Sequence, residues 1–322
     1  MHSFRPLPLL GNPHVQTVLG NLLAAPTRGL SSTIMTVELA DGDQVAAHDS
    51  VPAAWRQGDS VAVLVHGLGG CHRSSYMRRI ALRLVHRGVR VYRMDLRGCG
   101  AGVKLARRFY NAACSADIRS VLERLQVLHP DSPLLLAGFS LGGGIVVKLA
   151  GESADRPMTA LCAVAAVAPP LDLVRCSVLI ERQRFYDAHY ARKLVRDVRA
   201  HAAHFTDLPP ICFPRRLTLR QFDDLYTAPR WGYADALDYY RQASSLPWVA
   251  RTPVPTFLLT ARDDPFIAVE PFEALPKAPH IEVHIAPYGG HLGFLGADGQ
   301  GGIRWAERRV VDWLLQRAAT RN

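Results

Sequence analysis

The sequence of 322 residues has few cysteines, no long apolar run and no compositional repeat, and each shortage excludes a class of protein. No apolar run approaches the roughly 18 to 20 residues that a membrane-spanning helix needs. The six cysteines form no C-x-x-C pair and have no metal-like spacing to histidines, so we expect reduced thiols. Glycine and proline, at 25 and 22 residues, show no period that would indicate a fibrous protein. What remains is a globular chain, 48% apolar and 20% charged.

Lysine is also scarce, so the formal net charge of +10 comes almost entirely from arginine, which binds phosphate and carboxylate better than lysine does. Between residues 175 and 220, ten basic and four acidic side chains give a local charge of +6. This concentration predicts peripheral contact of that segment with anionic lipid or with a phosphate-bearing ester. No nucleic-acid recognition motif is present, so nucleic acid is not an expected partner.

Short β-branched runs alternate with helical patterns, which predicts an α/β fold with a mostly parallel central sheet flanked by helices. Residues 33–39 and 45–48, on either side of Asp41-Gly42, indicate an opening hairpin. Ser115 is expected to cap a helix with one apolar face. Further strands are expected at residues 61–65, 89–94, 134–137, 161–168, 256–260 and 281–286, and a closing helix at 303–318.

The N-terminal segment stands outside this alternation. Asn12 and Pro13 indicate the start of a helix with one apolar stripe, which is expected to pack on the domain, with docking on a membrane as the alternative. The stripe consists of Val15, Val18, Leu19, Leu22 and Leu23. The segment lacks a basic region followed by an unbroken apolar region, which predicts a cytoplasmic protein, peripheral at most at a membrane surface.

A second segment, residues 170–250, is too long for an ordinary connection between two strands and predicts an inserted, mainly helical cap. The expected organisation is therefore a core of residues 1–169 and 251–322, with residues 1–30 as an N-terminal extension, and a cap of residues 170–250. Twelve of the chain's 26 aromatic residues lie in the cap segment, so we expect it to supply an apolar acyl pocket.

A G-x-S-x-G motif, Gly138 to Gly142, follows the strand expected at 134–137 and precedes a helical pattern. A strand that turns sharply into a helix exposes the serine at the edge of the sheet, and glycines leave room for the strained backbone. This context predicts Ser140 as a nucleophile.

A serine nucleophile needs a base and an orienting acid. His291 follows the last expected strand, and Asp263-Asp264 follows the strand before it, so the order Ser, Asp, His fits this architecture. We expect Asp264 to be the acid because Pro265 and an apolar pair follow it, with Asp263 as a loop-capping neighbour and the alternative.

An oxyanion hole needs two backbone N–H groups. Leu141, directly after the nucleophile, is expected to supply one, and Leu68, in the H-G-L-G-G loop after residues 61–65, the other. His66 in the same loop is expected to organise the loop rather than to catalyse.

Six segments carry a family resemblance: FRPLPLLGNPHVQTV at 4–18, HGLGG at 66–70, RMDLRGCG at 93–100, GFSLGGG at 138–144, ARDDPFI at 261–267 and GGHLGFL at 289–295. Over nearly its whole length the chain resembles the YheT-like α/β-hydrolases, also called AB hydrolase family 4. The resemblance implies an α/β-hydrolase fold and a carboxylester hydrolase with Ser140, Asp264 and His291 as triad; eukaryotic relatives act on phospholipids or other medium-chain acyl esters. The chain departs from the family at Tyr110-Asn111, where relatives tend to carry Tyr-His, and this departure bears on substrate contacts rather than on the triad.

The sequence thus predicts a serine hydrolase that cleaves small acyl esters, of short- to medium-chain or lipid type, through an acyl-enzyme. No metal and no organic cofactor is expected. Two alternatives stay open: acyl transfer to an alcohol by the same residues, and non-catalytic ligand binding on this fold.

Overall fold

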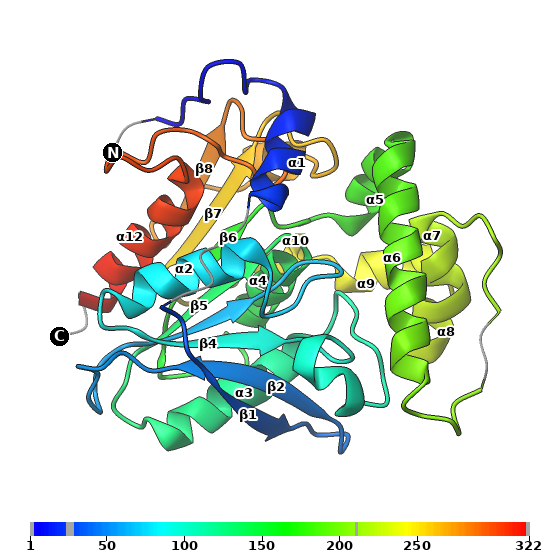
Figure 1. The fold of residues 1–322 in the computed structure, drawn as a ribbon, viewed down its shortest axis with the longest axis horizontal. Coiled ribbons are helices and arrows are strands. Elements are labelled where there is room, and N and C mark those ends of the chain that lie inside the picture. Colours follow the sequence, from blue (N-terminus) through cyan, green and yellow to red (C-terminus); the bar gives the residue numbers. More distant parts are fainter. Residues whose placement is uncertain (1–2, 24–28, 210–211, 320–322) are drawn as a thin grey trace.

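A computed structural model describes residues 3–23, 29–209 and 212–319. This part of the chain is built on an eight-stranded sheet of order β1-β2-β4-β3-β5-β6-β7-β8 (Figure 1). β2 is antiparallel to β1 and to β4, and every other neighbouring pair is parallel. The strands are β1 (Thr33–Glu38), β2 (Gln44–Ser50), β3 (Val61–Val65), β4 (Arg90–Asp95), β5 (Leu134–Phe139), β6 (Leu161–Val167), β7 (Thr256–Ala261) and β8 (Ile281–Ala286).

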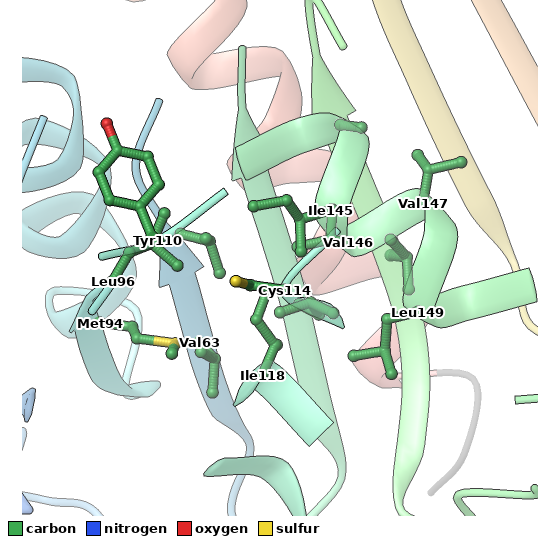
Figure 2. Packing of buried hydrophobic residues seen from close by; sticks show 14 of the residues in the cluster. Val63, Met94, Leu96, Tyr110, Cys114, Ile118, Ile145, Val146, Val147 and Leu149 are labelled. Atoms are coloured by element: carbon green, nitrogen blue, oxygen red, sulfur yellow. The ribbon is translucent and has the colours of Figure 1, made fainter. Parts of the chain in front are cut away.

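Helices cover both faces of the sheet, because the middle strands are apolar on both sides. On one face, Val63 of β3 shares a buried cluster with Ile118 of α3 (Ser115–Leu128) and Leu149 of α4 (Leu141–Glu152), as Figure 2 shows. On the other face, Leu64 belongs to a second buried cluster that includes side chains of α2 (Ser75–Val85) and Trp313 of α12 (Trp305–Ala319). The sheet is thus the middle layer of three, and its carboxyl edge is free to carry a site.

Between β6 and β7 the described chain is mainly helical. The elements are α5 (Leu173–Arg182), α6 (Arg184–Ala202), α7 (Leu219–Phe222), a π-helical turn η2 (Asp223–Thr227), α8 (Ala228–Trp231), α9 (Ala236–Ala243) and α10 (Leu246–Val249). In Figure 1, α5 to α8 stand beside the sheet, on the right of the view. Two short helices complete the chain, η1 (Gly100–Lys104) and α11 (Glu270–Glu273). Among the described residues, no helix has the length and apolar character that crossing a membrane requires.

The strand predictions are confirmed to within two residues at each end, and all six cysteines are free. Ser115 does not cap its helix: Cys114 is the N-cap residue, and Ser115 is the first helical residue. Ser115 Oγ instead contacts the Ala113 carbonyl at 3.5 Å. Residues 1–2 and 24–28 of the expected N-terminal extension lie outside the described residues.

The N-terminal helix α1 (Pro13–Leu22) begins as predicted, because the Asn12 side chain accepts hydrogen bonds from two amides of its first turn. The expectation that its apolar stripe packs on the domain is wrong. Val18 and Leu22 are 40% and 72% exposed, whereas Gln16 and Thr17 are buried. The helix turns its polar side inward since Gln16 Nε2 donates to the Leu10 carbonyl at 2.7 Å, and its Oε1 accepts from another backbone segment.

Candidate active site

Ser140 lies where β5 turns into α4, at the carboxyl edge of the sheet. Its φ of 52° is in the left-handed region, which residues with a side chain rarely adopt. The neighbouring glycines are needed for space: a Cβ on Gly138 would lie 2.3 Å from the Gly142 carbonyl oxygen, and one on Gly142 would lie 2.3 Å from that of His66. The motif therefore builds the tight strand-turn-helix corner that it predicts.

The three residues predicted as a triad come together, although 151 positions separate Ser140 from His291. His291 Nε2 lies 2.8 Å from Ser140 Oγ, and its Nδ1 lies 2.8 Å from Asp264 Oδ2. Asp264 Oδ1 accepts from the Phe266 and Ile267 amides at 3.1 and 3.0 Å. Because an ionised carboxylate only accepts, Nδ1 carries the imidazole proton and Nε2 is left to accept from the serine hydroxyl.

Asp263, the alternative acid, lies beside this arrangement and makes a different contact. Its Oδ1 accepts from the Gly290 amide at 2.9 Å, one residue before His291. Burial raises the pKa of Asp263. The structure therefore brings Asp264 to the imidazole and Asp263 to the loop that carries it.

Leu68 has a free backbone N–H group in the loop after β3. The amides around it are occupied: Gly67 donates to the Tyr76 hydroxyl at 2.9 Å, Gly69 to the Tyr110 hydroxyl at 2.7 Å and Gly70 to the Gly67 carbonyl at 3.0 Å. Within the described part of the chain, the Leu68 amide has no such acceptor. A single donor of this loop is thus left for a ligand.

The Leu141 amide is a second backbone donor without an acceptor among the residues that the structure describes. Leu141 opens α4, and first-turn amides have no acceptor inside their helix. The two loops approach closely, since a Cβ on Gly67 would lie 2.9 Å from Ser140 Cβ. Leu141, next to Ser140 in sequence, and Leu68, in the loop that approaches Ser140, therefore each offer one unoccupied N–H group.

His66 organises the loop, as expected. Its Nδ1 donates to the Gly67 carbonyl at 2.8 Å, and its Nε2 accepts from the Leu96 amide at 3.1 Å. Burial lowers the pKa of His66, which favours this neutral form.

Away from Ser140, one buried group in the described ranges has ligand atoms close enough together for a metal ion: His48, His72 and Asp95. Asp95 Oδ2 lies 3.1 Å from His48 Nε2 and 2.7 Å from His72 Nδ1. Arg73 Nε donates to His72 Nε2 at 3.3 Å, so His72 carries its proton on Nδ1 and directs it at Asp95. Although burial acts against it, hydrogen bonds from both histidines hold the pKa of Asp95 well below its usual range. The three residues form a hydrogen-bonded network that ties β2 and the loop before α2 to the end of β4.

The inward polar side of α1 holds the loop that carries His291, which the sequence analysis missed. The His291 amide donates to Thr17 Oγ1 at 2.9 Å, and the Leu295 amide donates to Gln16 Oε1 at 2.7 Å. This loop contains two non-glycine residues with positive φ, Leu292 at 59° and Phe294 at 41°. Such conformations persist only where the surroundings impose them. The polar pair Gln16-Thr17, opposite the apolar stripe of α1, was the feature of the sequence that could have indicated this contact.

A cavity opens beside Ser140, with walls from the sheet edge and from the helices between β6 and β7. Its lining is mainly apolar and aromatic, including Leu68, Phe109, Leu141, Leu173, Ile180, Tyr190, Leu194, Phe222, Tyr239, Tyr240, Phe266 and Ile267. Asp223 is a charged exception. Its carboxylate accepts from the Thr227 and Tyr240 hydroxyls, each at 2.6 Å, and burial raises its pKa to about 6.

Comparisons with known proteins agree with this geometry. The sequence model described as the alpha/beta hydrolase family matches residues 62–300. The Escherichia coli protein YheT, named as a candidate esterase, is 34% identical over 97% of this chain and 93% of its own. Medium-chain fatty acid ethyl ester synthase/esterase 2 of Saccharomyces cerevisiae is 28% identical over 80% of this chain, which spans only 62% of that protein. Among solved structures, an esterase of Pyrococcus furiosus has a TM-score of 0.60 at 15% identity, with 98% of both chains covered, and shows a shared fold.

Proposed function

Because the chain belongs to the alpha/beta hydrolase family, we propose that it is a serine hydrolase that cleaves carboxylic esters through an acyl-enzyme. The observation that carries the proposal is the continuous path of hydrogen bonds from Ser140 through His291 to Asp264, beside an apolar cavity. The esterase names of the two relatives agree with it.

In the proposed reaction His291 Nε2 takes the proton of Ser140 Oγ as this oxygen attacks the ester carbonyl. Asp264 stabilises the imidazolium that forms, which then gives its proton to the departing alcohol oxygen. A water molecule, deprotonated by the same nitrogen, attacks the acyl-enzyme; the bond between the acyl carbon and Ser140 Oγ then breaks, His291 returns the proton to Oγ, and the acid leaves. The free amides of Leu68 and Leu141 bind the oxyanion that develops in both steps.

The cavity is the proposed acyl site, and residues 170–250 the proposed cap that closes it. Ile180 of α5 lines this cavity, whereas Val178 of the same helix is 41% exposed. Ile180→Trp should narrow the cavity and lower kcat/KM for decanoate relative to acetate by about tenfold or more, the scale of a one- or two-methylene misfit. The measurement is a rate series on p-nitrophenyl esters from acetate to palmitate, with Val178→Trp as the matched control. If kcat/KM of the wild type did not depend on chain length, or if both variants changed this dependence equally, the cavity would not be the acyl site.

Thr17 is proposed as a positioning residue. Thr17→Val deletes the hydroxyl that accepts from the His291 amide but keeps the side-chain shape. We expect kcat to fall by about tenfold with little change in KM, because a small displacement of the base slows proton transfer more than binding. Thr17→Ser restores the hydroxyl and should restore kcat. Equal rates for all three proteins would show that the contact only supports the fold.

Acyl transfer to an alcohol is the second candidate, favoured by the synthase/esterase name of the yeast relative. It differs only in the acceptor that attacks the acyl-enzyme. Product analysis in the presence of ethanol or glycerol separates the two: free acid indicates hydrolysis, and a new ester indicates transfer.

We also propose that α1 and the start of the cap contact anionic lipid. The rings of His14 on α1 and Tyr186 on α6 stack with centres 5.7 Å apart, so the two helices start close together. Helices α1, α5 and α6 also carry exposed side chains: the apolar Val15, Val18, Leu22, Val178 and Phe185, and the arginines Arg175, Arg182 and Arg184. An apolar surface bordered by basic residues is suited to an anionic membrane surface.

Co-sedimentation with vesicles tests this contact. Binding should require anionic phospholipid and weaken in high salt. The double variant Arg182→Glu and Arg184→Glu should bind at least about thirtyfold more weakly, since each basic residue near such a surface contributes about 1 kcal/mol. Arg87→Glu with Arg124→Glu, exposed residues after α2 and on α3, is the charge-matched control. Binding that ignores lipid charge and salt would contradict the proposal.

A further inference from the structure

Asn111 is a buried amide in the wall of the cavity that holds Ser140. It lies in the connection between η1 and α3 and is one of the residues that line the cavity, together with Leu68 and Leu141. The residue is only 3% exposed. At this depth a polar group must find its hydrogen-bond partner in the protein or in a ligand.

The backbone amides on either side of Asn111 have hydrogen-bond partners. The Tyr110 amide donates to the Arg97 carbonyl at 3.3 Å, the Ala112 amide to the Tyr239 hydroxyl at 2.8 Å, and the Ala113 amide to Asn111 Oδ1 at 2.6 Å. The last contact also settles which side-chain atom is the oxygen, because an NH₂ group could not accept that hydrogen.

The other end of the amide is different. Asn111 Nδ2 is buried and has no hydrogen-bond partner among the described residues. Leaving a buried donor unpaired costs free energy, and native proteins keep few such groups without a reason. Because Asn111 lines a cavity that also contains the proposed nucleophile, a ligand that enters this cavity is the natural partner for Nδ2.

We propose that Asn111 is a substrate-binding residue whose Nδ2 donates a hydrogen bond to a second oxygen of the substrate, beyond those of the reacting ester group. The class of ligand is an acyl ester with an ether, hydroxyl or further ester oxygen in its acyl or alcohol part. Such a ligand satisfies the unpaired donor, whereas a purely hydrocarbon analogue leaves it unpaired and is rejected. This inference rests on the proposed ester-binding cavity but not on turnover.

The test therefore measures binding to the Ser140→Ala variant, in which turnover does not interfere, by calorimetry with matched ligand pairs. One pair places the oxygen in the acyl part, p-nitrophenyl 3-methoxypropanoate against the pentanoate. The other places it in the alcohol part, 2-methoxyethyl butyrate against butyl butyrate. In one of the two pairs the oxygen-bearing ester should bind about tenfold more tightly, and that pair tells which part of the substrate faces Asn111.

Two further substitutions in this background assign the preference. Asn111→Asp keeps an oxygen for the Ala113 amide but places an acceptor where the donor was, and Asn111→Leu removes both groups in a similar volume. Both should abolish the preference for the oxygen-bearing ester. Thr260→Val is the control, because Thr260 Oγ1 is also buried without a partner but its side chain does not line the cavity.

The proposal is overturned if neither pair shows a preference, or if the preference survives in Asn111→Asp and Asn111→Leu. Preferential binding without ester hydrolysis by the wild type would instead contradict the proposed function and leave the Asn111 contact standing. Thermal unfolding of each variant confirms that the binding data come from folded protein.

Discussion

Ser140→Ala should lower kcat for p-nitrophenyl butyrate by about 10⁴- to 10⁶-fold, the loss expected when the nucleophile of a triad is removed. Alanine also has a Cβ, so the variant should keep the backbone conformation with φ of 52°. It loses only the oxygen that lies 2.8 Å from His291 Nε2. The remaining rate would come from binding and from the oxyanion amides alone. Steady-state assays of p-nitrophenol release by the two proteins measure the difference in kcat.

Ser177→Ala is the matched control for this prediction. Ser177 lines the same cavity, but its hydroxyl donates to the Val174 carbonyl at 2.8 Å and is not in contact with the imidazole. This variant should keep most of the wild-type rate. Undiminished hydrolysis by Ser140→Ala would exclude Ser140 as the nucleophile.

Asp264→Asn should lower kcat by about 10⁴-fold, the second largest effect. The NH₂ group that replaces Oδ2 donates a hydrogen bond and cannot accept one from His291 Nδ1. The imidazole then carries its proton on Nε2, where it can no longer accept the proton of Ser140. Asp264 Oδ1 can still accept from the Phe266 amide, so the loop should keep its shape. The change isolates the electrostatic and tautomeric role of the carboxylate.

Asp263→Asn compares the neighbouring acid directly. Its Oδ1 can still accept from the Gly290 amide, so we expect a loss of activity far below that of Asp264→Asn. Since burial raises the pKa of Asp263, its neutral substitute should also be tolerated by the fold. The reverse order of effects would make Asp263 the acid of the triad.

The sheet was predictable because strands buried on both faces, such as residues 61–65, are short apolar runs between turn residues. The corner at Ser140 was predictable because the motif places glycines where a Cβ would clash with the backbone. Helix α1 was predicted in its place but with the wrong face inward. Apolar periodicity assumes that the apolar side is buried, and it cannot register that Gln16 and Thr17 bond to a loop almost 280 residues away.

Contacts between distant segments account for what the sequence did not indicate at the site. The sequence predicts Leu68 as an oxyanion donor from its place in the loop, but it cannot show that Tyr76 and Tyr110 occupy the amides on either side. Asn111 stood out in sequence as a departure from a family pattern. Its unpaired nitrogen becomes visible only when the cavity wall is assembled.

The most direct test of the central claim, that Ser140 is a nucleophile activated by His291, is mass spectrometry of the protein after reaction with an alkyl fluorophosphonate. The serine oxygen displaces fluoride, so the protein gains one phosphonyl group, and peptide mapping locates it. The account predicts a single adduct on Ser140, absent from Ser140→Ala and formed far more slowly by His291→Ala. An adduct on another residue, or none in a protein that hydrolyses esters, would contradict it.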